Sequence, residues 1–205
     1  MGERSVRRTA ILDRDGTIID VVRHEDVGVV TVAFHPDQLR VLPGAIEGLR
    51  ALQEAGYVLA MATNQPGPAK GQWSADAVAR TNAALLELLS HRGIEIAAAE
   101  VCMHHPEGGP GGDPSLVRSC DCRKPRPGML NALVQNLDAD RAQSWMIGDS
   151  VSDIQAGVGA GLKTGLVFSS NRCELCPMRG ASVSPAPEVY GATLLEVAAA
   201  ILRHP

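Results

Sequence analysis

Short apolar runs alternate along the chain with stretches in which apolar residues recur every three or four positions. Largely apolar runs of four to six residues are typical of strands buried on both faces, and they occur at residues 9–12, 57–62, 96–101, 144–147 and 163–168. The periodic stretches predict amphipathic helices at residues 45–55, 74–92, 127–137 and 153–160. This alternation predicts an α/β fold with three layers, in which a Rossmann-like parallel sheet has helices on both faces.

Residues at the predicted helix ends support these boundaries. Ser74 is a side-chain cap for the second helix, and Gly56 stops the first. Pro127 suits the first turn of the third helix, and the sequence from Thr193 to Glu196 has the form of a capping box that opens a last helix. The segments between the elements are short and leave no room for a separate cap domain. We therefore expect a single domain across residues 1–205.

Composition excludes several classes of protein. The chain has 205 residues, of which 45% are hydrophobic and 20% charged, so it is neither disordered nor collagen-like. Aromatic residues make up 3% and the formal net charge is -4, which disfavours base-stacking modules and gives no overall attraction to nucleic acid or to an anionic membrane. The apolar run before Asp13 is too short for a signal peptide, and no stretch is long enough to span a membrane. We expect a cytoplasmic protein that acts as a monomer.

Carboxylates follow two of the predicted strands. Asp13 and Asp15 come directly after the first strand, and because strand-end residues alternate in direction, both are expected to face one pocket while Arg14 points away. Asp149 and Asp153 follow the fourth strand. Neighbouring carboxylates resist simultaneous ionisation unless a cation lies between them or one keeps its proton, which suits a nucleophile and a general acid–base beside Mg²⁺. Ordinary turn and cap residues are the alternative interpretation.

The ordered set of motifs resembles the haloacid-dehalogenase-like phosphohydrolases. The matching segments are residues 13–17, 63–65, 124 and 148–153. The resemblance implies that Asp13 attacks phosphorus and becomes an aspartyl phosphate, while Asp15 protonates the leaving oxygen and then activates water. It implies that Mg²⁺ is held by Asp13, Asp149 and the backbone carbonyl of Asp15, and that Asp153 orients Lys124 or a metal-bound water. The residues implied to contact the phosphoryl group or the rest of the substrate are Thr63, Asn64, Gln65 and Lys124.

Two close pairs of metal-binding residues, Cys102 with His104 and Cys120 with Cys122, form the spacing C-x-H-x15-C-x-C. Four soft or borderline ligands match tetrahedral Zn²⁺ and leave no position for water, so the metal is expected to be structural. Zinc would close a loop over residues 102–122, whose glycine-rich centre cannot form regular structure. Incidental thiols are the alternative interpretation, and His105 is a competing histidine.

The zinc loop narrows the resemblance to a branch of the family without a cap domain, which includes heptose-bisphosphate and histidinol-phosphate phosphatases. This resemblance implies that Arg123 contacts the distal part of a small phosphorylated sugar and that Lys124 contacts the transferring phosphoryl group. The expected reaction is removal of the 7-phosphate from D-glycero-D-manno-heptose 1,7-bisphosphate. Histidinol phosphate or a broad range of small phosphate esters are alternative substrates, and a non-catalytic zinc interaction module is an alternative of a different class.

The chain departs from that branch in three places. Residues 20–36 replace a shorter substrate-contacting loop and are expected to add a hairpin, where Arg23 and His24 are candidate substrate contacts. Ser150 stands where heptose bisphosphatases can carry a lysine, so one positive charge is missing. An additional C-x-x-C, Cys173 to Cys176, is expected to hold free thiols, with a second zinc site as the alternative.

Overall fold

A computed structural model describes residues 7–168 and 184–204 of the chain. It contains a six-stranded sheet in the order β5-β4-β1-β6-β7-β8, in which every neighbouring pair is parallel. The strands are β1 (Thr9–Leu12), β4 (Val58–Asn64), β5 (Ile96–Cys102), β6 (Trp145–Gly148), β7 (Lys163–Val167) and β8 (Val189–Gly191). The five predicted strands are confirmed, whereas β8 was not expected. It has three residues, and its central Tyr190 is largely exposed, so it gives no apolar run.

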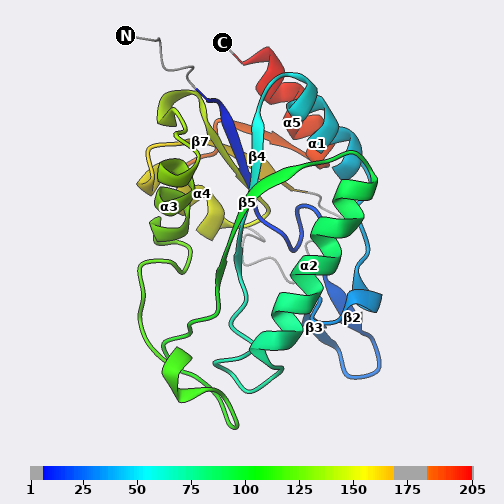
Figure 1. The fold of residues 1–205 in the computed structure, drawn as a ribbon, viewed down its shortest axis with the longest axis vertical. Helices are drawn as coiled ribbons and strands as arrows, with labels where there is room; N and C mark the ends of the chain where they lie inside the picture. The colour runs from blue at the N-terminus through cyan, green and yellow to red at the C-terminus, as the bar shows by residue number, and fades with distance from the viewer. Residues whose placement is uncertain (1–6, 169–183, 205) are drawn as a thin grey trace.

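Helices cover both faces of the sheet, as the sequence predicts (Figure 1). They are α1 (Ala45–Glu54), α2 (Ala75–His91), α3 (Gly128–Asn136), α4 (Val151–Gly159) and α5 (Leu194–Arg203). Successive side chains of β1 point to opposite faces of the sheet, each of which has its own hydrophobic core. Ala10 and Leu12 pack with the buried residues of α1, α2 and α5, whereas Ile11 packs with those of α3 and α4. The sheet is therefore the middle of three layers.

Helix ends differ from the prediction in three details. Pro127 is the residue before α3 rather than in its first turn. Helix α4 begins at Val151 instead of residue 153, because the Ser150 N–H donates to Oδ2 of Asp153 at 3.0 Å and so caps the helix earlier. Helix α5 begins where expected, with Thr193 as its cap, but the Glu196 carboxylate accepts from the N–H of Ala192 rather than from the cap residue.

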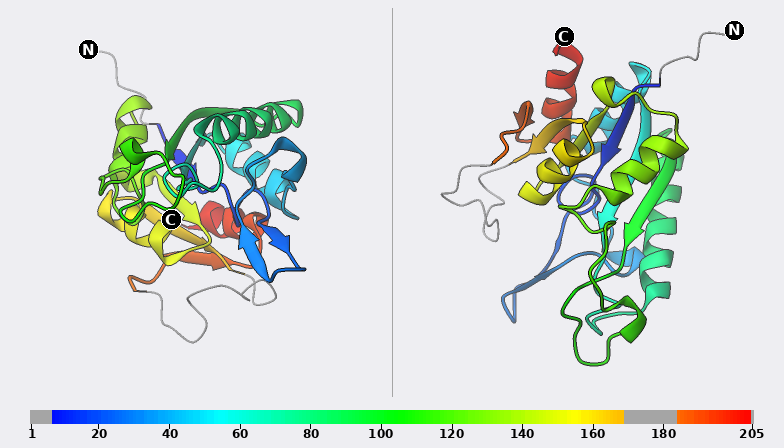
Figure 2. Two further views of the ribbon diagram at one scale, coloured as in Figure 1. Left: turned by 90° about the horizontal axis from the view of Figure 1, so that it is seen from below. Right: turned by 90° about the vertical axis from the view of Figure 1, so that its left-hand side faces the viewer.

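The segment after β1 forms the expected hairpin from β2 (Val22–His24) and β3 (Val29–Thr31), which pair antiparallel. Figure 2 shows this hairpin at the end of the molecule toward which the parallel strands point. Three short 3₁₀ helices were not expected: η1 (Pro36–Gln38), η2 (Pro114–Leu116) and η3 (Arg141–Gln143). In the part of the chain that the structure describes, no helix combines the length and the apolar character that crossing a membrane requires.

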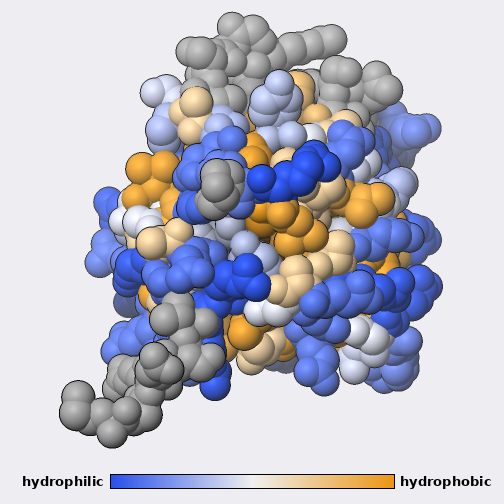
Figure 3. Space-filling model, turned by 90° about the horizontal axis from the view of Figure 1, so that it is seen from above, coloured by the Kyte–Doolittle hydropathy of each residue, from blue (hydrophilic) through white to orange (hydrophobic). Residues whose placement is uncertain are grey.

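The opposite end of the molecule, where the strands begin and both termini lie, has a mixed surface. Figure 3 views this end and shows hydrophilic side chains around a limited apolar area. The residues that carry the sequence motifs lie instead beyond the carboxyl ends of the strands, which is where parallel α/β sheets bind ligands.

Candidate active site

Three carboxylates converge at the carboxyl ends of β1 and β6. Asp13 follows β1, Asp149 follows β6, and Asp153 lies in the first turn of α4. One ligand atom from each of the three lies within 4.8 Å of the others. Gly16 permits this approach, because a Cβ atom there would lie 2.0 Å from Oδ2 of Asp149. Its φ of +83° is also one that glycine adopts without strain.

The convergence forms a small cavity of about 150 Å³. Asp13 and Asp15 both line it, as the alternation at the strand end predicts. The remaining lining residues come from the segment after the hairpin, from β4, from the segment after Cys122 and from the start of α4. They are Val32, Thr63, Asn64, Lys124, Ser150, Ser152 and Asp153. Sequence reasoning missed Val32 and Ser152, because neither residue type carries a chemical signal of its own.

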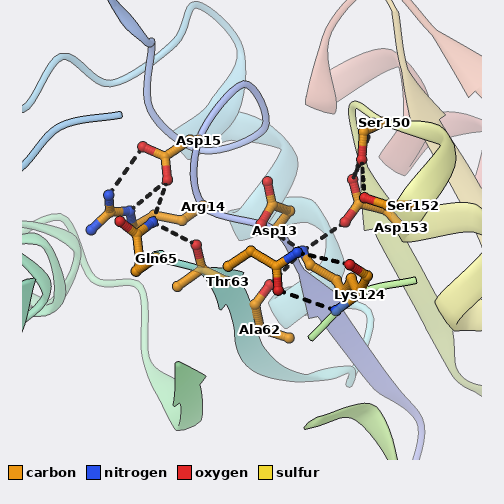
Figure 4. A network of polar contacts seen from close by, with 11 residues as sticks. Asp13, Arg14, Asp15, Ala62, Thr63, Gln65, Lys124, Ser150, Ser152 and Asp153 are labelled. Carbon is orange, nitrogen blue, oxygen red and sulfur yellow. Dashed lines mark hydrogen bonds and ion pairs between the residues drawn. The ribbon is translucent and has the colours of Figure 1, made fainter. Parts of the chain in front are cut away.

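Lys124 is buried between two of these carboxylates. Its Nζ lies 2.7 Å from Oδ1 of Asp13 and 2.6 Å from Oδ1 of Asp153, and it also donates to the carbonyl of Ala62 at 2.8 Å (Figure 4). Asn64 holds the backbone of the same residue, since its side chain accepts from the Lys124 N–H at 3.1 Å and donates to the Lys124 carbonyl at 3.0 Å. The expected contact of Asp153 with Lys124 is present, and Asn64 has a positioning contact that the sequence did not predict.

Asp15 is held by two buried neighbours. Arg14 donates from Nε and Nη2 to the two carboxylate oxygens of Asp15, at 2.9 and 3.1 Å, and Gln65 Nε2 donates to Oδ2 at 2.7 Å. Gln65 also donates to the hydroxyl oxygen of Thr63 at 2.9 Å. Gln65 is fully buried and does not line the cavity. Its side chain contacts Asp15, and the substrate contact stays a prediction. Arg14 stays out of the cavity as expected, but its pairing with Asp15 was missed.

Burial and mutual repulsion perturb the acids. Burial, reinforced by the negative charges of Asp153 and Asp15 and opposed by Lys124, raises the pKa of Asp13 to about 7. Burial and the charges of Asp13 and Asp153 raise the pKa of Asp149 well above its usual range. Burial would lower the pKa of Lys124, but Asp13 and Asp153 outweigh it, so that pKa is raised and the ammonium stays charged. One ammonium thus faces more negative charge than it neutralises.

This donor set fits a hard divalent cation. Carboxylate oxygens on one side of a small cavity are the ligands that Mg²⁺ prefers, and a cation would relieve the repulsion that raises the acid pKa values. The side chains that converge are Asp13, Asp149 and Asp153. The sequence predicts that Asp153 only orients Lys124 or a metal-bound water. In the structure its carboxylate also lies close enough to those of Asp13 and Asp149 to share a metal ion with them.

A second cluster lies at the base of the loop over residues 102–122. One ligand atom each from Cys102, His104, Cys120 and Cys122 lies within 4.8 Å of the others. The Cys102 sulfur is 3.6 Å from that of Cys120 and 3.2 Å from that of Cys122, and His104 Nδ1 is 3.2 Å from the Cys122 sulfur. Burial and a hydrogen bond with Cys122 raise the pKa of the Cys102 thiol. Three sulfurs and one imidazole nitrogen at these separations fit one tetrahedral metal ion.

A second cavity, of about 280 Å³, lies beside this cluster. Its lining is rich in cationic side chains: Arg118, Arg123, Lys124 and Arg126. His105 also lines it and lies outside the metal cluster, as the C-x-H spacing predicts. Within the described residues, the Nη1 atom of Arg123 is buried and has no hydrogen-bond partner. These cationic residues outnumber Glu107, the one carboxylate residue of the lining, so the cavity suits an anion.

Comparison with known proteins agrees with this geometry. The HAD-hydrolase-like family profile matches residues 121–177. The D-glycero-beta-D-manno-heptose-1,7-bisphosphate 7-phosphatase of Pasteurella multocida is 35% identical over 167 residues, which cover 82% of this chain and 84% of that protein. The protein of the same name from Rhodopseudomonas palustris is 38% identical and covers 76% of this chain and 81% of its own length. The chain belongs to the heptose-bisphosphate 7-phosphatase family of haloacid-dehalogenase-like hydrolases.

A solved structure of this family shows the same fold. The D,D-heptose 1,7-bisphosphate phosphatase from B. bronchiseptica, complexed with magnesium and phosphate, aligns with a TM-score of 0.75 and 28% identity, and the match covers 96% of this chain and 98% of that one. The resemblance drawn from the sequence motifs is thus confirmed, and so is the α/β fold.

The two hairpin candidates for substrate contact, Arg23 and His24, stay predictions. Arg23 and His24 do not reach either cavity: Arg23 Nη1 pairs with Asp20 at 3.1 Å, and His24 Nε2 lies 3.1 Å from the Thr31 hydroxyl within the hairpin. The hairpin instead contributes Val32 to the catalytic cavity. Cys173 and Cys176 lie outside the described residues, so the prediction for them stays a prediction.

Proposed function

We propose that this enzyme removes the 7-phosphate of D-glycero-D-manno-heptose 1,7-bisphosphate. The proposal rests on the position of Lys124. This residue lines both the cavity of about 150 Å³ that contains Asp13 and the cavity of about 280 Å³ beside the cysteine–histidine cluster. Two cavities that meet at Lys124 suit a small substrate with two phosphates. One phosphate would lie against Asp13, and the other would lie against Arg123.

In the first step, a carboxylate oxygen of Asp13 forms a bond to phosphorus while the ester oxygen–phosphorus bond breaks. Asp15 gives a proton to the departing sugar oxygen. Lys124 contacts Asp13 and so places positive charge where an anionic nucleophile meets an anionic phosphate. The Thr63 hydroxyl oxygen accepts from Gln65, which leaves its own proton to donate to a phosphoryl oxygen in the cavity.

In the second step, Asp15 takes a proton from a water molecule whose oxygen attacks the phosphorus of the aspartyl phosphate. The bond between phosphorus and Asp13 breaks, inorganic phosphate leaves, and the Asp13 carboxylate is restored. Asp13 and Asp149 would hold Mg²⁺ with the backbone carbonyl of Asp15, and the adjacent Asp153 carboxylate would also face it. Bound Mg²⁺ offsets the negative charge of the phosphoryl group and of the carboxylates.

The cysteine–histidine cluster would hold a structural Zn²⁺ through Cys102, His104, Cys120 and Cys122. Such an ion fixes the base of the loop two residues before Lys124. Its thiolate ligands must remain reduced, which supports a cytoplasmic location. We also propose that residues 1–205 form one domain, because the strands of one sheet come from both ends of the described chain.

A substrate panel tests the proposed activity. The purified Mg²⁺-loaded enzyme would be assayed for phosphate release from heptose 1,7-bisphosphate, a heptose monophosphate, histidinol phosphate and p-nitrophenyl phosphate. We expect the highest kcat/KM for the bisphosphate. A higher value for histidinol phosphate would reject the heptose assignment, and similar values for all would indicate a broad phosphatase.

A matched pair of variants tests the second phosphate position. Arg123→Gln should raise KM for the bisphosphate about tenfold or more, since it removes the charge-assisted contact proposed for the second phosphate, and should leave KM for the monophosphates nearly unchanged. Arg126→Gln is the control from the same cavity: the side chain of Arg126 is largely exposed, and its Nη1 donates to the Cys120 carbonyl. Equal effects of the two variants would contradict a specific role for Arg123.

A further inference from the structure

Arg14 is a fully buried arginine between the two aspartates of the first motif. Its guanidinium pairs side-on with Asp15, with Nε 2.9 Å from Oδ2 and Nη2 3.1 Å from Oδ1. Two parallel hydrogen bonds fix both the position and the plane of a carboxylate. Figure 4 shows the result, in which Asp15 is turned toward Arg14 and Gln65 while Asp13 is turned toward Lys124.

The remaining donors of Arg14 attach to two other segments. Nη1 donates to Oδ1 of Asn82, a residue of α2, at 2.6 Å. Nη2 also donates to the carbonyl of Ala33, directly after the hairpin, at 2.8 Å. The neighbouring Val32 lines the catalytic cavity together with Asp15. Arg14 therefore connects Asp15, α2 and the cavity wall that the hairpin provides.

Stabilisation of the fold does not by itself explain a buried ion pair such as that between Arg14 and Asp15. Replacing a buried ion pair by packed apolar residues is often neutral or stabilising, because removing two charges from water costs about as much as their attraction returns. The arrangement does specify geometry strongly, since four hydrogen bonds on one rigid guanidinium leave Asp15 little freedom to rotate.

We propose that Arg14 is a positioning residue, which sets the direction of the Asp15 carboxyl group relative to the cavity and links that direction to the hairpin wall. The inference rests on the proposed phosphoryl transfer, in which Asp15 gives a proton to the leaving oxygen. Without Arg14, Asp15 keeps its carboxyl group but loses its fixed geometry, and a proton donor is effective only within hydrogen-bond reach of its target.

Leaving-group dependence separates positioning from a structural role. An alkyl phosphate needs a proton on its leaving oxygen, whereas p-nitrophenolate leaves without one. For Arg14→Gln we expect kcat/KM for the alkyl ester to fall on the order of tenfold further than kcat/KM for p-nitrophenyl phosphate, which is part of the 10²–10⁴ that a general acid supplies. A merely structural role would lower both values by the same factor and leave their ratio unchanged.

Further variants keep the test decisive. Asn82→Ala removes one hydrogen-bond partner of Arg14 and leaves the Arg14–Asp15 pair in place. It should therefore change the ratio of kcat/KM for the two esters in the same direction, but by less. If Arg14→Gln does not fold, Asn82→Ala provides the test. In an Asp15→Asn background, Arg14→Gln should leave the ratio unchanged, because the two residues act as one unit. Arg50→Gln, on the exposed surface of α1, is the control and should not change the ratio.

An unchanged ratio in both Arg14→Gln and Asn82→Ala would overturn the positioning role. So would a further change of the ratio by Arg14→Gln in the Asp15→Asn background. Wild-type hydrolysis of both test esters without activity on heptose bisphosphate would reject the substrate assignment and leave the positioning role standing. A wild-type enzyme without activity on either ester would overturn both.

Discussion

The Nζ atom of Lys124 lies 2.7 Å from Oδ1 of Asp13, although the two residues are 111 positions apart in the chain. The loop that delivers Lys124 begins at Cys102 and carries the cysteine–histidine cluster, so one connection supplies both the metal-type cluster and the cation of the catalytic cavity. The proposed nucleophile, Asp13, is thus paired with a charge whose position depends on that loop.

Removing this charge should affect stability and activity together. Lys124→Met leaves Asp13 and Asp153 buried without their partner, and breaking a buried pair costs about 3–5 kcal/mol. We expect the free energy of unfolding in denaturant to fall by about that amount and turnover to be abolished. Lys124→Met combined with Asp153→Asn should recover part of the stability but none of the activity. Full activity in either variant would exclude Lys124 from phosphoryl transfer.

Magnesium binding should strengthen as pH rises. Burial raises the pKa of Asp13 from its usual value near 3.8 to about 7, so the metal-free folded protein takes up protons that the unfolded chain does not hold between these values. Stability of the metal-free protein should therefore fall as pH rises through this window. Mg²⁺ binds the ionised form, and saturation at 100 times its Kd would stabilise by about 2.7 kcal/mol. Thermal unfolding from pH 5 to 8 with and without Mg²⁺ measures this, and a shift independent of pH would contradict it.

The turn within the first motif, at Gly16, should not tolerate a side chain. Gly16→Ala places a Cβ atom 2.0 Å from Oδ2 of Asp149, so we expect Asp149 to be displaced, with loss of the Mg²⁺-induced rise in Tm and at least a tenfold loss of kcat. Gly28→Ala is the matched control, because Gly28 also has a positive φ, +64°, but no atom lies within 4 Å of its added Cβ. Both variants should lose about 1–2 kcal/mol of stability from backbone strain. Equal losses of activity would show that strain rather than the clash is responsible.

The cysteine–histidine cluster should bind one metal ion. Cys120→Ser removes a sulfur 3.6 Å from that of Cys102, and we expect zinc content measured by elemental analysis to fall well below one equivalent. Protease cleavage within residues 102–122 should then accelerate, because the loop loses its closure. Cys173→Ser is the control for a thiol elsewhere in the chain and should retain zinc. A full equivalent in Cys120→Ser, or a loss in the control, would indicate a different ligand set.

Local patterns in the sequence were enough to predict most of the fold. Strand β1 and the turn at Gly16 follow from a buried apolar run and a local motif, and the C-x-H and C-x-C pairs needed only their spacing. Strand β8 escaped prediction because three residues with an exposed Tyr190 contain no period. It is defined by pairing with β7, which is a tertiary contact.

The features of the site that the sequence did not predict depend on contacts between residues far apart in the chain. The alternation rule placed Arg14 away from the cavity, but its contact with Asn82 joins residues 68 positions apart, and no local pattern specifies that. Asn64 similarly holds the backbone of Lys124 across 60 positions. Arg23 was a candidate because its segment replaces a substrate-contacting loop of the family; in the structure it pairs with Asp20, and the residue after the hairpin that lines the cavity is Val32.

Trapping of the covalent intermediate tests the central claim most directly. The claim is that a carboxylate oxygen of Asp13 forms the bond to phosphorus. Asp15→Asn should form the aspartyl phosphate from p-nitrophenyl phosphate, whose leaving group needs no proton, and should hydrolyse it slowly. After acid quench, mass spectrometry should find one phosphoryl group on the peptide that contains Asp13, and none in the variant that also carries Asp13→Asn. Release of p-nitrophenol in a single turnover without a phosphorylated peptide, or with the phosphoryl group on another residue, would contradict the account.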